Sequence, residues 1–112
     1  GNVVWKVVDK GVPVMCCGQK MEELIPGTTD AAQEKHVPAI KRDGDKVTIT
    51  VGSVVHPMLE EHSITMIAAV SGDTVTVRFP KPGDEPTLTV DSKEPVTAYE
   101  ICNLHGYWKG QE

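Results

Sequence analysis

The sequence lacks a long apolar run, an excess of basic charge and a large set of aromatic residues. No apolar stretch approaches the roughly 20 residues that a membrane-spanning helix needs. The 16 Asp and Glu residues outnumber the 11 Lys and Arg residues, so the formal net charge is −5. Because binding to nucleic acid or to an anionic membrane surface usually requires a basic face, we expect neither as a partner.

Cysteine is also scarce, since the chain of 112 residues contains only three. Small secreted domains usually carry four or more cysteines in even number, paired as disulfides. The first residues also lack the charged and long apolar segments of a secretory signal peptide. We therefore expect reduced thiols and a cytoplasmic location.

Leucine occurs only 4 times, against 16 Val, 6 Ile and 10 Thr. Branched side chains lose rotamer freedom in helices and pack well on pleated sheets. With 10 Gly and 8 Pro to separate the segments, this composition predicts an all-β sandwich or barrel.

Alternating apolar residues predict the central strands. In residues 46–51 the alternation places Val47, Ile49 and Val51 on one face. Residues 63–70 and 74–79 predict a β-hairpin, connected tightly through Ser71, Gly72 and Asp73. The residues of this hairpin expected to share an inward face are Ile64, Met66, Ala68 and Val70 on the first strand, and Val75, Val77 and Phe79 on the second.

Two shorter strands are predicted at residues 87–90 and 96–101, which gives five to seven short strands in all. Such a number is typical of an immunoglobulin-like β-sandwich. A single helical turn is expected within residues 29–34, and a domain boundary near residue 30. The fold class expected is thus an all-β sandwich with a short N-terminal extension.

All four histidines, His36, His56, His62 and His105, fall at strand ends or in loops, where a rigid sandwich presents functional groups. Solvent-facing histidines are the ordinary alternative. Cys102 precedes His105 by three residues, however, so two strong donors lie within one turn. Four imidazoles and a thiolate suit iron, copper or zinc better than magnesium or calcium.

The number of donors separates these metals. Structural zinc closes its shell with four ligands, so five donors are one too many. A blue-copper site uses two His, one Cys and usually a Met, but Met58 follows His56 and stands out of the usual order. Iron with five protein ligands and one open position agrees best with the donors present.

Four motifs in this order resemble those of superoxide reductase, the desulfoferrodoxin and neelaredoxin family. The resemblance covers residues 30–109, most of the chain, and the motifs include every histidine. The motifs are Glu34-Lys35-His36-Val37-Pro38, Val51-Gly52-Ser53-Val54-Val55-His56-Pro57-Met58, Glu60-Glu61-His62 and Cys102-Asn103-Leu104-His105-Gly106.

The resemblance implies one mononuclear iron with four equatorial imidazoles and one axial thiolate. The implied ligands are His36, His56, His62 and His105, with Cys102 as the thiolate. It further implies that Glu34 occupies the sixth position in the oxidised resting state and that Lys35 is the cation beside the open face. The implied reaction is the one-electron reduction of superoxide to hydrogen peroxide, with electrons from an external donor such as rubredoxin. The resemblance also implies a homo-oligomer, either a dimer or a tetramer.

Larger members of that family carry a second, N-terminal iron centre with a C-x-x-C pair and a later vicinal cysteine pair. This chain contains only the vicinal pair, Cys16 and Cys17. The first pair was either lost or lies upstream of Gly1. Residues 1–29 are expected to be a remnant of a desulforedoxin-like domain, with a metal site completed across a dimer as the alternative, and residues 30–112 the iron-binding catalytic sandwich. A copper electron-transfer protein and a zinc-stabilised binding module are the competing interpretations.

Overall fold

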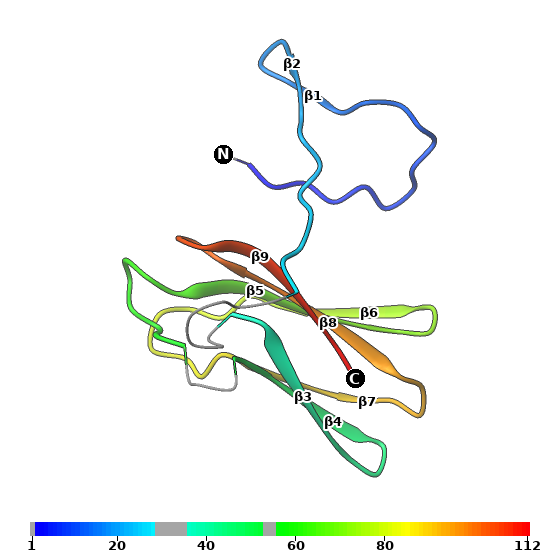
Figure 1. The fold of residues 1–112 in the computed structure, drawn as a ribbon, viewed down its shortest axis with the longest axis vertical. Coiled ribbons are helices and arrows are strands. Elements are labelled where there is room, and N and C mark those ends of the chain that lie inside the picture. The colour runs from blue at the N-terminus through cyan, green and yellow to red at the C-terminus, as the bar shows by residue number, and fades with distance from the viewer. Residues whose placement is uncertain (1, 29–35, 53–55) are drawn as a thin grey trace.

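The computed structural model describes residues 2–28, 36–52 and 56–112, and none of these lies in a helix (Figure 1). Nine strands follow one another along the chain: β1 (Met15–Cys16), β2 (Gln19–Lys20), β3 (Pro38–Asp43), β4 (Lys46–Val51), β5 (Ile64–Ser71), β6 (Thr74–Arg78), β7 (Thr87–Asp91), β8 (Val96–Cys102) and β9 (Gly106–Gln111).

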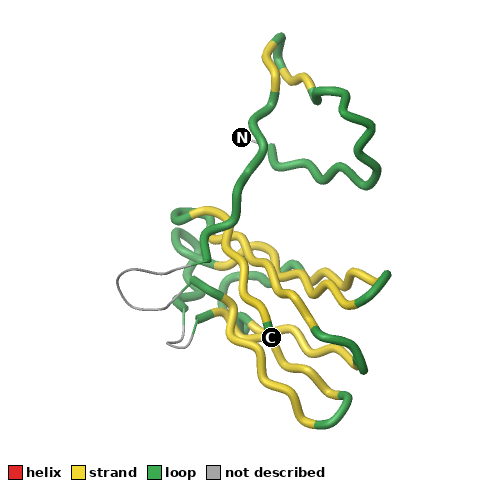
Figure 2. The backbone as a smooth tube through the Cα atoms, turned by 45° about the vertical axis from the view of Figure 1, so that its right-hand side comes forward, coloured by secondary structure: helices red, strands yellow, loops and turns green. Residues whose placement is uncertain are grey.

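Seven of these strands form two packed sheets, seen as two layers in Figure 2. One sheet has the order β3-β4-β7 and the other has the order β6-β5-β8-β9. All neighbouring strands in both sheets are antiparallel. The expectation of an all-β sandwich is therefore confirmed.

The core between the two sheets consists mainly of β-branched side chains. Val47, Ile49 and Val51 of β4 have no exposed surface, so the predicted face of this strand is confirmed. The other buried members of the cluster are Ile64, Ile67, Ala69, Leu88, Val96, Ala98 and Cys102. The core therefore extends to one of the candidate metal ligands.

Tight turns set the register of two hairpins of the sandwich, β3–β4 and β5–β6. In the predicted hairpin, Ser71 of β5 pairs with Thr74 of β6, so Gly72 and Asp73 alone form the turn. Gly44 and Asp45 do the same between β3 and β4, where Asp43 pairs with Lys46. Two-residue turns favour residues that tolerate positive φ, and Gly44 and Gly72 have φ of 62° and 57°.

The expected inward face of the predicted hairpin is confirmed at Ile64, which lies in the core, but is wrong for the rest of the hairpin. The register of β5 against β8 shifts between Ile64 and Met66, and this irregularity moves Ile67 and Ala69 onto the core face with Ile64. A one-residue shift exchanges the two faces of a strand. Met66, Ala68 and Val70 therefore lie on the outer face.

The same shift determines how β6 is oriented. Val75 pairs with Val70 and Val77 with Ala68, so both valines share the outer face of the sheet. Phe79, which follows the strand, is 72% exposed. None of the three residues expected to face inward on this strand belongs to the buried core.

Two strands of the sandwich were not predicted, β3 and β9. β3 starts with a proline and contains three charged residues, a composition compatible with its place at the edge of a sheet. β9 contains two glycines, and a Cβ at Gly110 would collide with the carbonyl group of Pro38. Glycine is thus needed where the edges of the two sheets approach each other.

An ion pair joins these same edges. Arg42 of β3 donates two hydrogen bonds to the carboxylate of Glu112, which follows β9. Hydrogen bonding to Arg42 lowers the pKa of Glu112 to about 2. The guanidinium also donates to the carbonyl groups of Ser92 and Glu94, at 2.5 and 2.8 Å, so it links three segments at this end of the sandwich.

The N-terminal segment, residues 2–28, projects from the sandwich, and the β1–β2 hairpin lies at its far tip (Figure 1). It leaves many large hydrophobic side chains exposed: Val3, Val4, Trp5, Val7, Val8, Val12, Met15, Leu24 and Ile25. It joins the sandwich through Gly27, which forms a parallel bridge with Trp108 of β9.

The helical turn expected within residues 29–34 and the domain boundary expected near residue 30 both lie outside the described residues. Within the part of the chain that the structure describes, no helix is long and apolar enough to cross a membrane.

Truncating a core residue should destabilise the sandwich far more than the same change in the N-terminal segment. We expect Ile49→Ala to lower the free energy of unfolding by about 2–5 kcal/mol, because the truncated side chain leaves a cavity in the core. Ile25→Ala is the matched control, since Ile25 is 77% exposed, and should change it by about 0.5 kcal/mol or less. Urea unfolding measures both, and equal losses would contradict the assigned core.

Candidate metal centre

The four histidines and Cys102 all come from one end of the sandwich. His36 precedes β3 and His56 follows β4, and these strand ends are neighbours because Pro38 pairs with Val51. His62 precedes β5, whose first residue Ile64 pairs with Cys102 at the end of β8. His105 lies in the turn between β8 and β9. The antiparallel pairing therefore gathers the five residues.

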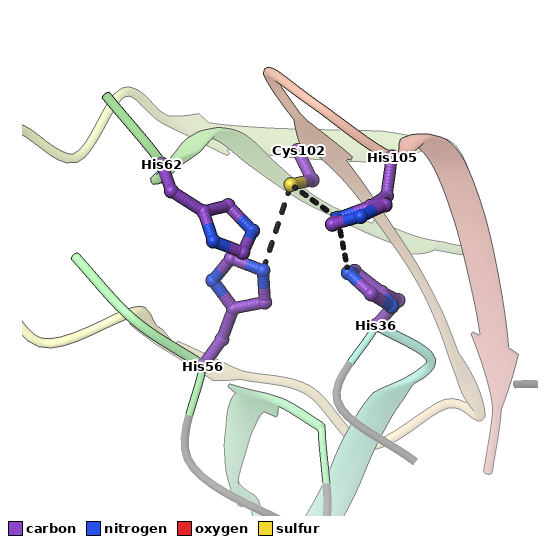
Figure 3. A group of neighbouring side chains, drawn as sticks. All are labelled: His36, His56, His62, Cys102 and His105. Carbon is purple, nitrogen blue, oxygen red and sulfur yellow. Dashed lines mark hydrogen bonds between the residues drawn. The ribbon is translucent and has the colours of Figure 1, made fainter. Parts of the chain in front are cut away.

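Their side chains point toward one another (Figure 3). One donor atom from each of the five residues can be chosen so that all lie within 4.8 Å of one another. His36 Nε2 lies 3.1 Å from His105 Nδ1. Cys102 Sγ lies 3.5 Å from His56 Nε2 and 3.7 Å from His105 Nδ1.

These separations suit a single coordination shell. First-row metals bind imidazole nitrogen at about 2.1 Å and thiolate sulfur at about 2.3 Å, so neighbouring donors at right angles lie about 3.0 Å apart and opposite donors about 4.2–4.4 Å apart. The observed 3.1 Å between His36 and His105 matches the first value. The distances to sulfur require only small movements. The donor set therefore fits one transition-metal ion.

The protonation of His56 is already suited to binding. Its Nδ1 lies 2.7 Å from the carbonyl oxygen of Pro57, so Nδ1–H donates and Nε2 keeps its lone pair toward the cluster. Burial, aided by the neighbouring histidines, lowers the pKa of His56. A neutral imidazole is the form that binds a metal.

The thiol of Cys102 has the opposite requirement. Burial raises its pKa, and the charge of Glu100 acts in the same direction, while backbone hydrogen bonds from Leu104 and His105 lower it. The thiol must therefore release a proton when it binds an ion, which couples metal affinity to pH. Glu100 is fully buried two residues before Cys102 on the same face of β8, and sequence reasoning missed it.

The cluster has a buried side and an accessible side. Cys102 and His56 are each only 1% exposed. His36 and His62 are half-buried, and His105 is exposed. A small molecule can therefore approach from the side of these last three residues, whereas the sulfur is shielded by the core.

Asn103 connects two of the segments that supply the donors. Its side-chain oxygen accepts from Ser63 N–H at 3.0 Å, and its side-chain amide donates to the carbonyl of Glu61 at 3.0 Å. Its backbone N–H also donates to the carbonyl of Ser63. The residues on both sides of His62 are thus held against the turn that carries Cys102 and His105. Sequence reasoning gave Asn103 no role, although its place between Cys102 and His105 in the fourth motif could have indicated one.

The alternative copper donor, Met58, has another role. Its sulfur accepts a hydrogen bond from the backbone N–H of Ile64 at 3.3 Å. Its side chain packs against the hydrophobic core. The expected residues Glu34 and Lys35 lie outside the described residues.

Comparison with known proteins agrees with this geometry. The profile of the desulfoferrodoxin family matches residues 28–111. The chain belongs to the desulfoferrodoxin family. It is 43% identical to the desulfoferrodoxin of Nitratidesulfovibrio vulgaris over 112 residues, which cover 99% of this chain and 89% of that relative. It is 45% identical to the desulfoferrodoxin homolog of Archaeoglobus fulgidus over 111 residues, which cover 97% and 88% of the two chains.

Solved structures support the same family. The superoxide reductase from Treponema pallidum superposes with a TM-score of 0.75 at 34% identity, covering 94% of this chain and 89% of that one. The superoxide reductase (1Fe-SOR) from Giardia intestinalis gives a TM-score of 0.63 at 32% identity, covering 71% and 98%.

The vicinal cysteines lie apart from the cluster, at the β1–β2 hairpin of this desulfoferrodoxin-family chain. Both are exposed, and their sulfur atoms are 3.7 Å apart. Cys17 has a φ of 54°, as the turn between the two short strands requires. These residues contribute no donor to the five-residue cluster.

Replacing the thiol of Cys102 should abolish an absorption band that remains when an exposed thiol, such as that of Cys16, is replaced. We expect Cys102→Ser to abolish the thiolate-to-metal absorption band of the Co²⁺-loaded protein and to weaken Co²⁺ binding about tenfold or more. The control Cys16→Ser alters an exposed thiol on the distant hairpin and should preserve both. A Cys102→Ser variant that retained the band would contradict the position of the sulfur in the centre.

Proposed function

We propose that this protein is a superoxide reductase, which converts superoxide to hydrogen peroxide with one electron and two protons. The observation that carries the proposal is the cluster of four imidazole nitrogens and one thiolate sulfur within 4.8 Å, in a chain of the desulfoferrodoxin family. Iron held by these residues would supply the electron, and an external donor would return it.

The ligands proposed for the iron are His36, His56, His62, His105 and Cys102. Four neutral imidazoles and one thiolate reduce the charge of a ferrous ion from +2 to a formal +1. This local charge favours an anion such as superoxide, although the whole chain carries −5. At physiological salt, charges more than about 8 Å away are largely screened. The groups that surround the open position therefore decide whether the anion approaches.

Five protein donors would leave room for one further ligand, the substrate. The accessible imidazoles of His36, His62 and His105 lie on the side from which a small anion can arrive. The buried sulfur of Cys102 donates electron density from the protected side, which favours the higher oxidation state. This division matches a centre that gives an electron to a small ligand while its thiolate is kept from solvent.

Two further residues are proposed to act at the open position. Lys35 would attract superoxide, since one charge pair about 6 Å apart contributes roughly 3 kcal/mol at an effective dielectric near 20. It would also place a water molecule for the first proton transfer. Glu34 would replace the product and occupy the sixth position in the oxidised resting state. Both assignments rest on the match of Glu34-Lys35-His36 to the family motif.

The division of the chain is likewise proposed. Residues 30–112 would form the catalytic domain, because all five ligands and the whole core lie there. Residues 1–29 would be a remnant of a desulforedoxin-like domain, which contains the vicinal pair Cys16 and Cys17.

Three arguments support the proposed compartment, electron donor and oligomeric state. The three cysteines are all free, which supports a reducing, cytoplasmic compartment. A rubredoxin-like protein is the proposed electron donor, from the resemblance to the family. The apolar N-terminal segment and the outer face of β5 and β6, where Val75 is 38% exposed, support a homo-oligomer, because large exposed apolar areas mark protein interfaces.

The decisive test is the stoichiometry of products from protein that has been loaded with iron, reduced and separated from the reductant. We expect one superoxide to be consumed and one hydrogen peroxide to form per iron, without dioxygen, because the iron provides the missing electron. A superoxide dismutase instead yields one peroxide and one dioxygen from two superoxide ions. Dioxygen release would contradict the proposal, as would purified protein with stoichiometric copper or zinc and no iron.

The role of Lys35 makes a separate prediction. We expect Lys35→Ala to slow superoxide reduction about 3- to 10-fold at low ionic strength, with unchanged iron content and a smaller difference at high salt. Lys93→Ala is the matched control, because Lys93 precedes β8 at the end opposite Cys102, about 20 Å away at the rise of a strand. Pulse radiolysis measures the rates, and an equal salt dependence in both variants would exclude the role of Lys35.

A further inference from the structure

Trp108 contacts two of the clustered histidines in different ways. Its ring is stacked on that of His36, with centroids 5.0 Å apart and planes 18° from parallel. Its indole Nε1–H donates a hydrogen bond of 3.0 Å to the backbone carbonyl of His105. His36 and His105 are 69 residues apart in the sequence, and their donor atoms are 3.1 Å apart. One indole therefore sets the orientation of one ring and the backbone that carries the other.

The indole is itself held by the segment that leads into the sandwich. Gly27 N–H donates to the carbonyl of Tyr107, and Lys109 N–H donates to the carbonyl of Gly27, each at 2.9 Å. These bonds place the backbone of Gly27 against the six-membered ring of Trp108. A Cβ at residue 27 would lie 2.8 Å from both Cε3 and Cζ3 of the indole. A side chain at this residue would therefore push the indole from its place.

The stacked indole bears directly on the orientation of the His36 ring. Cys102 belongs to β8, and His56 is held by its own hydrogen bond to Pro57. His36 precedes β3 and is half-buried. Stacking against a planar indole restricts rotation of the imidazole without using either of its nitrogen atoms. Residues that orient metal-binding histidines typically change metal affinity 10- to 100-fold when replaced.

We propose that Trp108 is a positioning residue, which holds His36 and His105 in the geometry of the metal centre, with Gly27 as its support. The inference rests on the proposed metal centre, and it adds a function to a residue that contributes no ligand atom. The N-terminal segment, residues 2–28, thereby also affects the metal centre, because it contacts Trp108 through the bridge at Gly27.

Metal titration tests this role without the need to measure activity. The chain contains two tryptophans, and Trp5 is exposed in the N-terminal segment. Trp5→Phe is the matched control and also leaves Trp108 as the only tryptophan. In this background we expect Co²⁺ or Fe²⁺ binding to quench the indole fluorescence, with one ion per chain and the affinity of the wild type.

Three substitutions then separate the contributions. Trp108→Leu removes the stacking and the N–H donor, and should weaken Co²⁺ binding 10- to 100-fold. Trp108→Phe keeps an aromatic face but has no N–H donor, so it should bind more tightly than Trp108→Leu and less tightly than the wild type. Gly27→Ala keeps the indole but displaces it, and should weaken binding several-fold and shift the thiolate-to-metal band.

The possible outcomes are distinguishable. If Trp108→Leu and Gly27→Ala both bind Co²⁺ as tightly as the Trp5→Phe control, the positioning role is wrong while the metal centre stands. If the wild type binds no ion, the proposed function fails and the inference fails with it. If thermal unfolding shows that Trp108→Leu does not fold, Gly27→Ala decides, since it retains every side chain of the sandwich. An unchanged affinity and band in that variant would overturn the proposal.

Discussion

Four imidazole nitrogens and one sulfur atom face one another at one end of this sandwich, within 4.8 Å. Lone pairs brought so close repel one another unless a proton or a metal cation lies between them, and partial burial deepens the cost because little water reaches them. Burial lowers the pKa of His56, and the neighbouring imidazoles act in the same direction. The arrangement is therefore best explained as the binding site of a metal ion, and the strand ends that meet there serve to position its donors.

The sandwich can hold this arrangement because its register leaves the donors little freedom. Strand ends that are adjacent by pairing, such as Pro38 with Val51 and Ile64 with Cys102, carry the donors into the same place. Asn103 ties the loop of His62 to the turn of His105, and Trp108 touches both His36 and the backbone of His105. At the opposite end, Arg42 and Glu112 join the edges of the two sheets.

The position of the sulfur divides the centre into two environments. Cys102 is part of the core cluster, whereas His105 is exposed. An ion held between them is bound by a shielded thiolate on one side and is accessible on the other. Such a division suits the transfer of an electron to a small anion, because the thiolate is protected while the ligand exchanges.

The amino-acid sequence by itself determined the fold class, the strands with strict alternation and the identity of the donors. Val47, Ile49 and Val51 could be assigned to the core because alternation along a strand is a local property. The tertiary structure alone decided the faces of β5 and β6, since the irregularity between Ile64 and Met66 arises from pairing with β8. It also decided that β3 and β9 are strands, because their neighbours supply the hydrogen bonds that their mixed composition does not predict. Above all, only the folded chain could bring His36 to within 3.1 Å of His105, because contacts between residues so distant in sequence depend on the packing of two sheets.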